Sequence, residues 1–213
     1  MGTLNVANLN HTGNTFTTNA NLNFGGSWVD APIGTIIKRG SYNTGYGSGS
    51  RTQTSSLTWG TVLIGGTNQA AFNLTKVSGL DILSFTKLSN KSHLEISINF
   101  PYYLQYGNQG FGIRCQASND GGSNYVLLGN LENGPANAWG AGGYGGHDAG
   151  VLHFTFSTYD NSTERSSWLA RTGEVRFYFQ VRVWNSSDIL YMIDHSNIYP
   201  KEGTIQISEI ITE

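Results

Sequence analysis

The histidines and the carboxylates near them are the side chains that would bind a metal ion. His147 and Asp148 are adjacent in a Gly-rich stretch, and Asp120 or Glu132 would have to complete the ligand set. Imidazole and carboxylate are ordinary metal ligands. However, this spacing matches no known ligand pattern, and adjacent side chains of an extended chain point to opposite sides. We therefore expect no metal ion and no other cofactor.

The side chains that could serve nucleophilic or acid–base catalysis do not occur in any known catalytic motif. No serine lies in a G-x-S-x-G or S-x-x-K setting, and the 14 carboxylates are scattered. A glycosidase pair of carboxylates stays open, although no spacing nominates one. Cys115 alternates in phase with Phe111 and Ile113, which is typical of a buried structural thiol. We expect no catalytic residue and no enzymatic activity.

One glycine pattern resembles a nucleotide-binding signature. Gly140-Ala-Gly-Gly-Tyr-Gly145 matches G-x-G-x-x-G. That signature works only where a strand precedes it and a helix follows, because backbone amides at the helix N-terminus hold the pyrophosphate. The sequence predicts neither element here, so we do not interpret the pattern as a nucleotide site.

Composition excludes several classes of partner. Charged residues make up only 12% of the 213, 28 residues are Gly, and the formal net charge is -2. A nearly neutral chain without a basic stripe argues against nucleic-acid binding. No apolar run approaches the roughly 20 residues that span a bilayer, which argues against a membrane. A polar but weakly charged surface is instead suited to stable assembly.

Alternation with a period of two is the dominant pattern and predicts an all-β protein. Val175 to Val183 place apolar residues at every second position, and Ile205 and Ile207 repeat the pattern near the C-terminus. No stretch carries a helical apolar stripe, so two antiparallel sheets packed face to face are expected. The predicted strands are 33–38, 57–64, 71–74, 80–86, 93–100, 111–117, 125–128, 151–156, 174–184, 189–193 and 204–210.

The first 31 residues differ from the remainder. Ala7-Asn-Leu-Asn10 recurs as Ala20-Asn-Leu-Asn23, each within a short stretch of strand-like alternation. Two such slender units cannot bury a core of their own, so we predict an extended N-terminal β-arm at 1–31 that anchors the body at 32–213. Chance repetition in an Asn-rich segment is the alternative. The arm residues expected to mediate assembly are Leu4, Val6, Leu9, Phe16, Leu22, Phe24 and Trp28.

Gly-rich loops carry aromatic side chains that suggest surface recognition. The loops are 40–56, 118–124 and 129–150, and the role of the last stays open. Rings in such loops stack on sugars or on protein surfaces. The alternative is that these rings pack under their own loops or against a neighbouring subunit. The candidate recognition residues are Tyr42, Tyr46, Trp139, Tyr144 and His147.

Several strand motifs resemble small virion proteins of tailed phages, notably those of aquatic bacteria. Pro32-Ile-Gly-Thr-Ile-Ile-Lys38 resembles their "P-x-G-T-I/V" opening, and Thr3-Leu-Asn-Val6 resembles the arm before it. Leu88 to Ile98 and Gly110-Phe-Gly-Ile-Arg-Cys115 are similar to two central strands. Gly203-Thr-Ile-Gln-Ile-Ser-Glu-Ile210 resembles the closing "S-T-I-T-L-x-E-I" strand.

The resemblance implies a jelly-roll sandwich and a homotrimeric structural protein. It would be a capsid decoration or cement protein on the outside of the head, bound to the major capsid protein or another virion protein. The alternative is a tail-fibre or receptor-binding protein that recognises a host surface glycan, and a free carbohydrate-binding module is the third. Shortness favours the head, because 31 residues provide too little chain for a fibre's attachment domain and shaft.

Overall fold

A computed structural model describes residues 33–46, 52–65, 69–107, 110–128, 146–159, 165–195 and 201–212. Residues 1–31, for which we predicted an extended arm, lie outside these ranges. Strands dominate the described part, and its single helix is the six-residue α1 (Arg165–Ala170). The prediction of an all-β protein with almost no helix is confirmed.

The larger sheet has seven strands, and all of its pairings are antiparallel. Its order is β2-β12-β7-β13-β1-β4, and β10 pairs with the other edge of β7. The C-terminal strand β13 therefore lies between β7 and β1. The strands are β1 (Ile36–Asn43), β2 (Thr52–Thr54), β4 (Ala70–Phe72), β7 (Ser92–Gly107), β10 (Gly146–Ser157), β12 (Ile189–Met192) and β13 (Thr204–Ile211).

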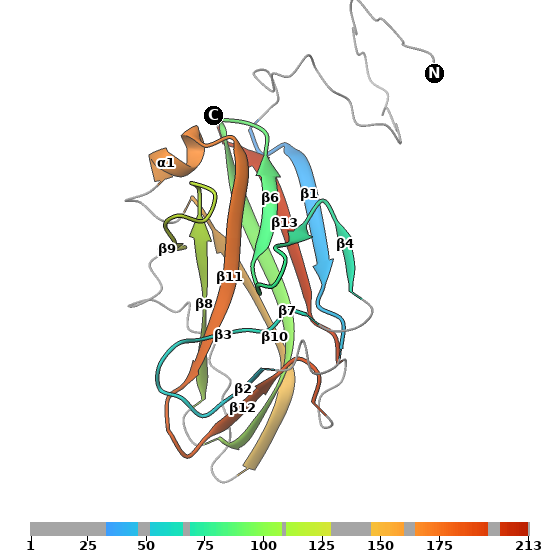
Figure 1. Cartoon of the computed structure of the whole chain (residues 1–213), viewed down its shortest axis with the longest axis vertical. Coiled ribbons are helices and arrows are strands. Elements are labelled where there is room, and N and C mark those ends of the chain that lie inside the picture. The colour runs from blue at the N-terminus through green and yellow to red at the C-terminus, as the bar shows by residue number, and fades with distance from the viewer. Residues whose placement is uncertain are drawn as a thin grey trace, which may run out of the picture.

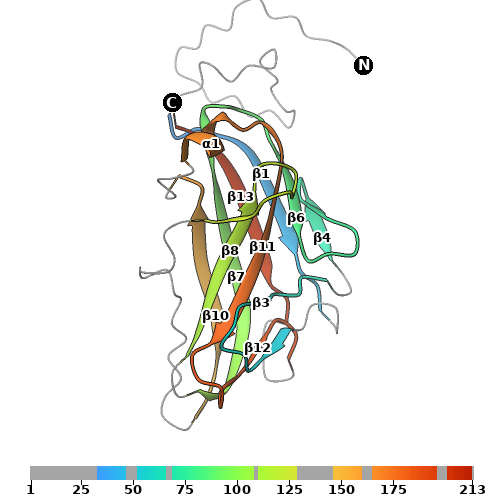
Figure 2. The same ribbon diagram turned by 60° about the vertical axis from the view of Figure 1, so that its left-hand side comes forward.

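The smaller sheet has six strands and packs face to face with the larger one (Figures 1 and 2). Its order is β5-β6-β11-β8-β9, and β3 pairs with β11 beyond the end of β6. The predicted antiparallel two-sheet sandwich is thus confirmed. The strands are β3 (Gly60–Thr61), β5 (Thr75–Lys76), β6 (Leu83–Lys87), β8 (Phe111–Ser118), β9 (Val126–Leu127) and β11 (Gly173–Val183).

The sequence placed several strand ends wrongly. The strand predicted to end at Phe100 continues through Pro101 to Gly107. Proline lacks a backbone N–H and normally interrupts a central strand. Here Pro101 lies where β7 changes partner from β13 to β12, and its carbonyl accepts a hydrogen bond from Ile193 at 2.8 Å. The missing donor therefore falls at a junction between two partner strands.

Two predicted loops also contain strand. β10 begins at Gly146, inside the predicted loop 129–150, and β1 and β2 occupy both ends of the predicted loop 40–56. These segments are rich in glycine and serine, so their sequences did not indicate strands. They are strands because they pair with neighbours that are distant in the sequence, and single-chain patterns do not reveal such pairing.

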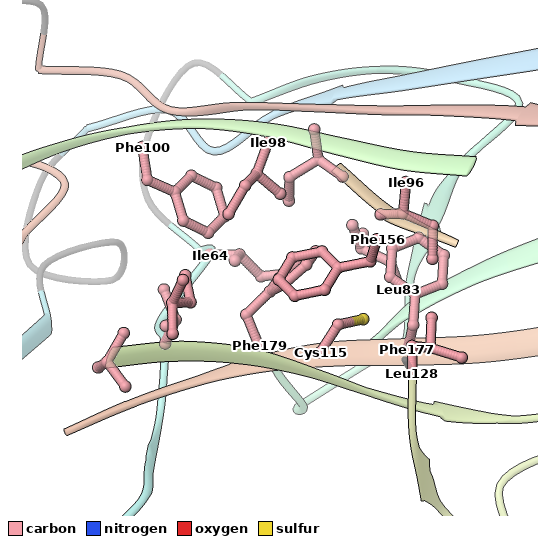
Figure 3. Close-up of a cluster of buried hydrophobic side chains, with 14 of the residues drawn as sticks. Ile64, Leu83, Ile96, Ile98, Phe100, Cys115, Leu128, Phe156, Phe177 and Phe179 are labelled. Atoms are coloured by element: carbon pink, nitrogen blue, oxygen red, sulfur yellow. The ribbon is translucent and has the colours of Figure 1, made fainter. Parts of the chain in front are cut away.

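Alternating side chains of the two sheets meet in one apolar core (Figure 3). The five apolar positions from Val175 to Val183 are each at most 1% exposed, as the alternation predicted. Phe179 on β11 contacts Phe100 on β7 edge to face, with ring centroids 5.3 Å apart. Cys115 is fully buried beneath these rings, and burial raises the pKa of its thiol. This agrees with the predicted structural role.

A buried carboxylate closes one end of the sandwich. The side chain of Glu209 points inward between two isoleucines of β13 and is 0% exposed. It accepts hydrogen bonds from the backbone amides of Leu88 and Ser89 at 2.8–2.9 Å and from Ser92 Oγ at 2.6 Å. These bonds fix the turn from β6, in the smaller sheet, to β7, in the larger.

A buried ammonium lies beside this carboxylate. Lys87 is 1% exposed, and its Nζ donates to the carbonyl oxygens of Leu169 and Arg171, at the end of α1, at 3.2 and 2.9 Å. It also donates to the Ser89 carbonyl. Burial lowers the pKa of Lys87 to about 8, and the charge of Glu209 opposes that shift. A cation at a helix C-terminus satisfies carbonyls that have no partner within the helix.

We expect Glu209→Gln to destabilise the fold strongly. The new amide would present N–H groups to backbone N–H donors, and the nearby ammonium of Lys87 would lose its opposing charge. A buried charge that is left uncompensated costs about 3 kcal/mol or more. The thermal midpoint should fall by roughly 6 to 12 °C. Glu95→Gln, on the solvent face of the same sheet, is the matched control and should change the midpoint little. Equal shifts of the thermal midpoint for the two variants would show that the buried hydrogen bonds of Glu209 do not contribute to stability beyond the effect of a surface charge.

Lys87 should give stability a distinct pH dependence. Its folded pKa of about 8 lies below the ordinary pKa of 10.5 for a lysine, so the unfolded chain binds more protons between these pH values. The free energy of unfolding therefore rises with pH through this window. The penalty of burying the ammonium is full below pH 8 and is lost progressively as the pH rises to about 10.5. Urea unfolding across this range should show a smaller rise for Lys87→Met. If the unfolding free energies of the wild type and of Lys87→Met rose equally with pH, the lowered pKa of Lys87 would be contradicted.

Candidate assembly surface

The outer face of the seven-stranded sheet is an array of short polar side chains, which we call the polar face. One row crosses it from Ser41 through Gln206 and Ser97 to Thr155. The next row runs from Asn43 through Thr204 and Asn99 to His153. These side chains share the outer face because the opposite positions of the same strands fill the core. The register therefore carries one uncharged polar surface across β1, β13, β7 and β10.

Hydrogen bonds within the polar face hold several of these side chains in place. The hydroxyls of Ser97 and Thr155 are 2.8 Å apart, and His153 Nδ1 lies 2.7 Å from Asn99 Oδ1. Asn99 Nδ2 donates to Thr204 Oγ1 at 3.3 Å. Short side chains that are already positioned lose little rotamer entropy when another surface covers them.

Charge on the polar face lies at its margins. Arg39 and Glu95 flank Ser208 in the register, and Glu95 lies 3.6 Å from His93 Nε2. The two rows described above contain no Asp, Glu, Lys or Arg. At the end of the second row, Asn43 Nδ2 donates to the carboxylate of Glu202 at 2.9 Å. Covering the remainder of the two rows would require no desolvation of a charged group, which is the largest penalty for burying a polar surface.

A shallow groove adjoins the polar face at the short edge strand β4. It has a volume of about 330 Å³, and its lining includes Phe72, Ser41 and Gln206. The Phe72 side chain is 63% exposed, the highest value among the large apolar residues of the described strands. Among the described strands β4 pairs with β1 alone, so its other edge presents backbone groups to a further strand. The groove thus combines an exposed ring, polar side chains and an open edge.

The predicted recognition residues do not form one site in the described part of the chain. Tyr42 lies in β1 and is 2% exposed, so its predicted exposure in a loop is wrong. Its hydroxyl donates to the Ile64 carbonyl at 3.3 Å and bonds to Gln69, and burial raises its pKa to about 12. The alternating inward phase of β1 carries Tyr42 into the core.

Of the other candidates, Tyr46 is 41% exposed and lies just beyond β1. The backbone of His147 lies in β10, but its side chain is outside the described set, as are Trp139 and Tyr144. The predicted arm residues also lie outside it: Leu4, Val6, Leu9, Phe16, Leu22, Phe24 and Trp28.

Sequence reasoning missed Phe72 and the polar face as a unit. The alternation in the C-terminal strand did place Gln206 and Ser208 away from the core. Nothing local to the sequence indicated that Ser97 and Ser41 would flank Gln206, because this depends on pairing across more than 100 residues.

Within the described ranges, no group of three or more His, Cys, Asp or Glu residues is arranged to hold a metal ion. The described part also contains no helix long and apolar enough to cross a membrane. Models of known protein families do not match the chain, and no curated protein does.

Replacement of Phe72 should separate a surface role from a role in stability. We expect Phe72→Thr, which keeps a strand-forming side chain, to change the unfolding free energy by no more than about 0.5 kcal/mol. Phe85→Thr, at a 1% exposed position, should cost about 3 kcal/mol or more. Urea unfolding of the isolated protein measures both. A comparable loss for Phe72→Thr would mean that its ring supports the subunit itself.

Proposed function

We propose that this protein is a structural component of a tailed-phage virion, a head decoration or cement protein that assembles as a homotrimer. The observation that carries the proposal is the polar face, with its uncharged rows of pre-positioned Ser, Thr, Asn and Gln. The resemblance of the strand motifs to virion proteins supports the same class. We infer that a second and a third copy of this chain cover the polar face.

The order of the strands supports the jelly-roll part of this proposal. Eight of the strands divide four to a sheet, in the orders β1-β13-β7-β10 and β6-β11-β8-β9. Along this set the chain passes repeatedly from one sheet to the other, and its first and last strands, β1 and β13, are neighbours. Two Greek keys wound over two sheets produce such an order in a jelly roll.

The dimensions of the polar face indicate that it does not act alone. At about 4.8 Å between strands and about 3.3 Å per residue, four strands by five residues project roughly 320 Å². A specific interface buries about 800 Å² on each partner. We therefore propose that residues 1–31 supply additional contact area, either to sister subunits or to the capsid. The open edge of β4 is suitable for strand addition.

A single charge on the polar face should disrupt assembly. We expect the full chain to have three times the 23.1 kDa mass of one subunit, and Ser97→Glu to shift it toward one subunit. Ser97 lies in the central strand, where three like charges would be buried without partners. Gln116→Glu, which adds the same charge to the outer face of the smaller sheet, should remain trimeric. Light scattering after gel filtration distinguishes these outcomes, and a monomeric wild type would reject the trimer.

Deletion of residues 1–31 should abolish attachment but preserve the body. The described core comes entirely from residues after the arm, so the truncated chain should remain folded and soluble. When mixed with phage heads that lack the protein, the full chain should sediment with the heads and the truncated chain should not. Full occupancy by the truncated chain would place the anchor in the body.

The alternative function is a tail-fibre or receptor-binding protein that recognises a host glycan. The groove beside Phe72 favours it, because an exposed ring with nearby hydroxyl and amide groups is suited to a sugar. A free carbohydrate-binding module would use the same chemistry outside a virion. Gold-labelled protein found on tails would favour the fibre, and a protein absent from purified virions would favour the free module.

A further inference from the structure

The outer face of the six-stranded sheet carries two arginines and two tryptophans that contact one another, which we call the arginine–tryptophan cluster. The guanidinium of Arg114, on β8, lies 4.4 Å from the ring centroid of Trp59. The guanidinium of Arg182, on β11, lies 4.6 Å from the same ring and 4.2 Å from the ring of Trp184. Stacking on aromatic rings fixes the plane of a guanidinium group.

Amide side chains extend the cluster along both strands. Arg114 Nε donates to Gln180 Oε1 at 2.9 Å, and Gln116 Nε2 lies 3.4 Å from the same oxygen. Gln180 and Arg114 are paired in the register, so these groups share the outer face. The face therefore presents guanidinium and amide donors beside aromatic rings.

The positive charge of Arg182 is not matched by a carboxylate in the described part of the chain. Its contacts there are the two indole rings, and its Nε has no hydrogen-bond partner among the described residues. The acidic residue of β11, Glu174, lies about 26 Å away along the strand. Glu174 is engaged by Arg176 at 3.1 Å and by Ser84 at 2.8 Å. A planar guanidinium held in this way is suited to a carboxylate or sulfate group from outside the protein.

We propose that the arginine–tryptophan cluster binds an acidic polysaccharide. The guanidinium of Arg182 binds a carboxylate of the sugar chain, and the amides of Gln116 and Gln180 bind its hydroxyl groups. This activity goes beyond the structural role proposed above and does not depend on whether the protein lies on the head or the tail. It also uses the opposite sheet from the polar face, so trimer formation leaves the cluster accessible.

A polysaccharide fits this site better than a nucleic acid does. The net charge of the chain is -2, and a nucleic-acid surface needs a stripe of many basic residues. Here the cationic groups are few and lie beside amides and rings. Such a mixture is suited to a ligand that carries sparse negative charges among many hydroxyl groups.

The test is calorimetric titration of the full-length protein with short oligogalacturonides, which carry one carboxylate per sugar. We expect binding that weakens as sodium chloride is added, because added ions screen exposed charges. Arg182→Gln should weaken binding about tenfold, the value of one charge-assisted hydrogen bond. Arg114→Gln is the second variant, on the neighbouring strand. Arg165→Gln is the matched control, because that arginine stacks on Tyr159 far from the cluster, and it should bind as the wild type does.

Several results would overturn the proposal. These are an absence of binding to the acidic oligosaccharide, equal weakening by Arg165→Gln, or equally tight binding of neutral dextran fragments. Tighter binding of a DNA duplex than of the oligosaccharide would also reject it. Thermal midpoints of all variants establish that they are folded. Because the titration does not involve virions, its failure would leave the proposed structural role intact.

Discussion

The buried carboxylate of Glu209 and the neighbouring ammonium of Lys87 are the interaction on which the arrangement of the two sheets depends. Glu209 holds the turn that carries the chain from the smaller sheet to the larger, and Lys87 holds the end of α1 against that turn. Lys38 adds a third link, from β1 to the Thr86 carbonyl at 2.7 Å. A buried charge without an opposite charge nearby would be costly at this site. Glu209 and Lys87 must therefore both be in place when the end of the sandwich closes. The hydrophobic core gives the sandwich most of its stability, and this network specifies how its end closes.

Two of the stretches that we compared with virion proteins meet in this network. The stretch from Leu88 to Ile98 and the stretch from Gly203 to Ile210 are two of the motifs that carry the resemblance. In the structure they meet, because Glu209 of the second binds Leu88, Ser89 and Ser92 of the first. Gly203 lies at the other end of β13 and packs against the core, where a Cβ would lie 2.9 Å from the Phe100 ring. Contact between these two stretches therefore helps to close the end of the sandwich.

The sequence predicted those features that depend on local alternation. Fold class, most strands and the inward positions of β11 and β13 follow from a period of two, which each strand displays by itself. The passage of β7 through Pro101 and the burial of Tyr42 depend on which strands become neighbours. The burial of Lys87 and Glu209 was not predicted for the same reason. Charged residues at inward positions of a strand contradict the expected pattern unless their hydrogen-bond partners are known. The polar face and the arginine–tryptophan cluster likewise exist only after strands from distant parts of the chain have paired.

The outer faces of the two sheets differ in chemistry and are suited to different partners. The larger sheet presents two rows of uncharged polar side chains suited to sister subunits, and the smaller presents guanidinium and indole groups suited to a charged ligand. A reconstruction of the virion tests this account most directly. We expect density for three copies on the outside of the head, with β7 and β13 of each copy facing the threefold axis and β8 and β11 facing outward. Copies that contact one another through β8 and β11, or density found only on the tail, would contradict the account.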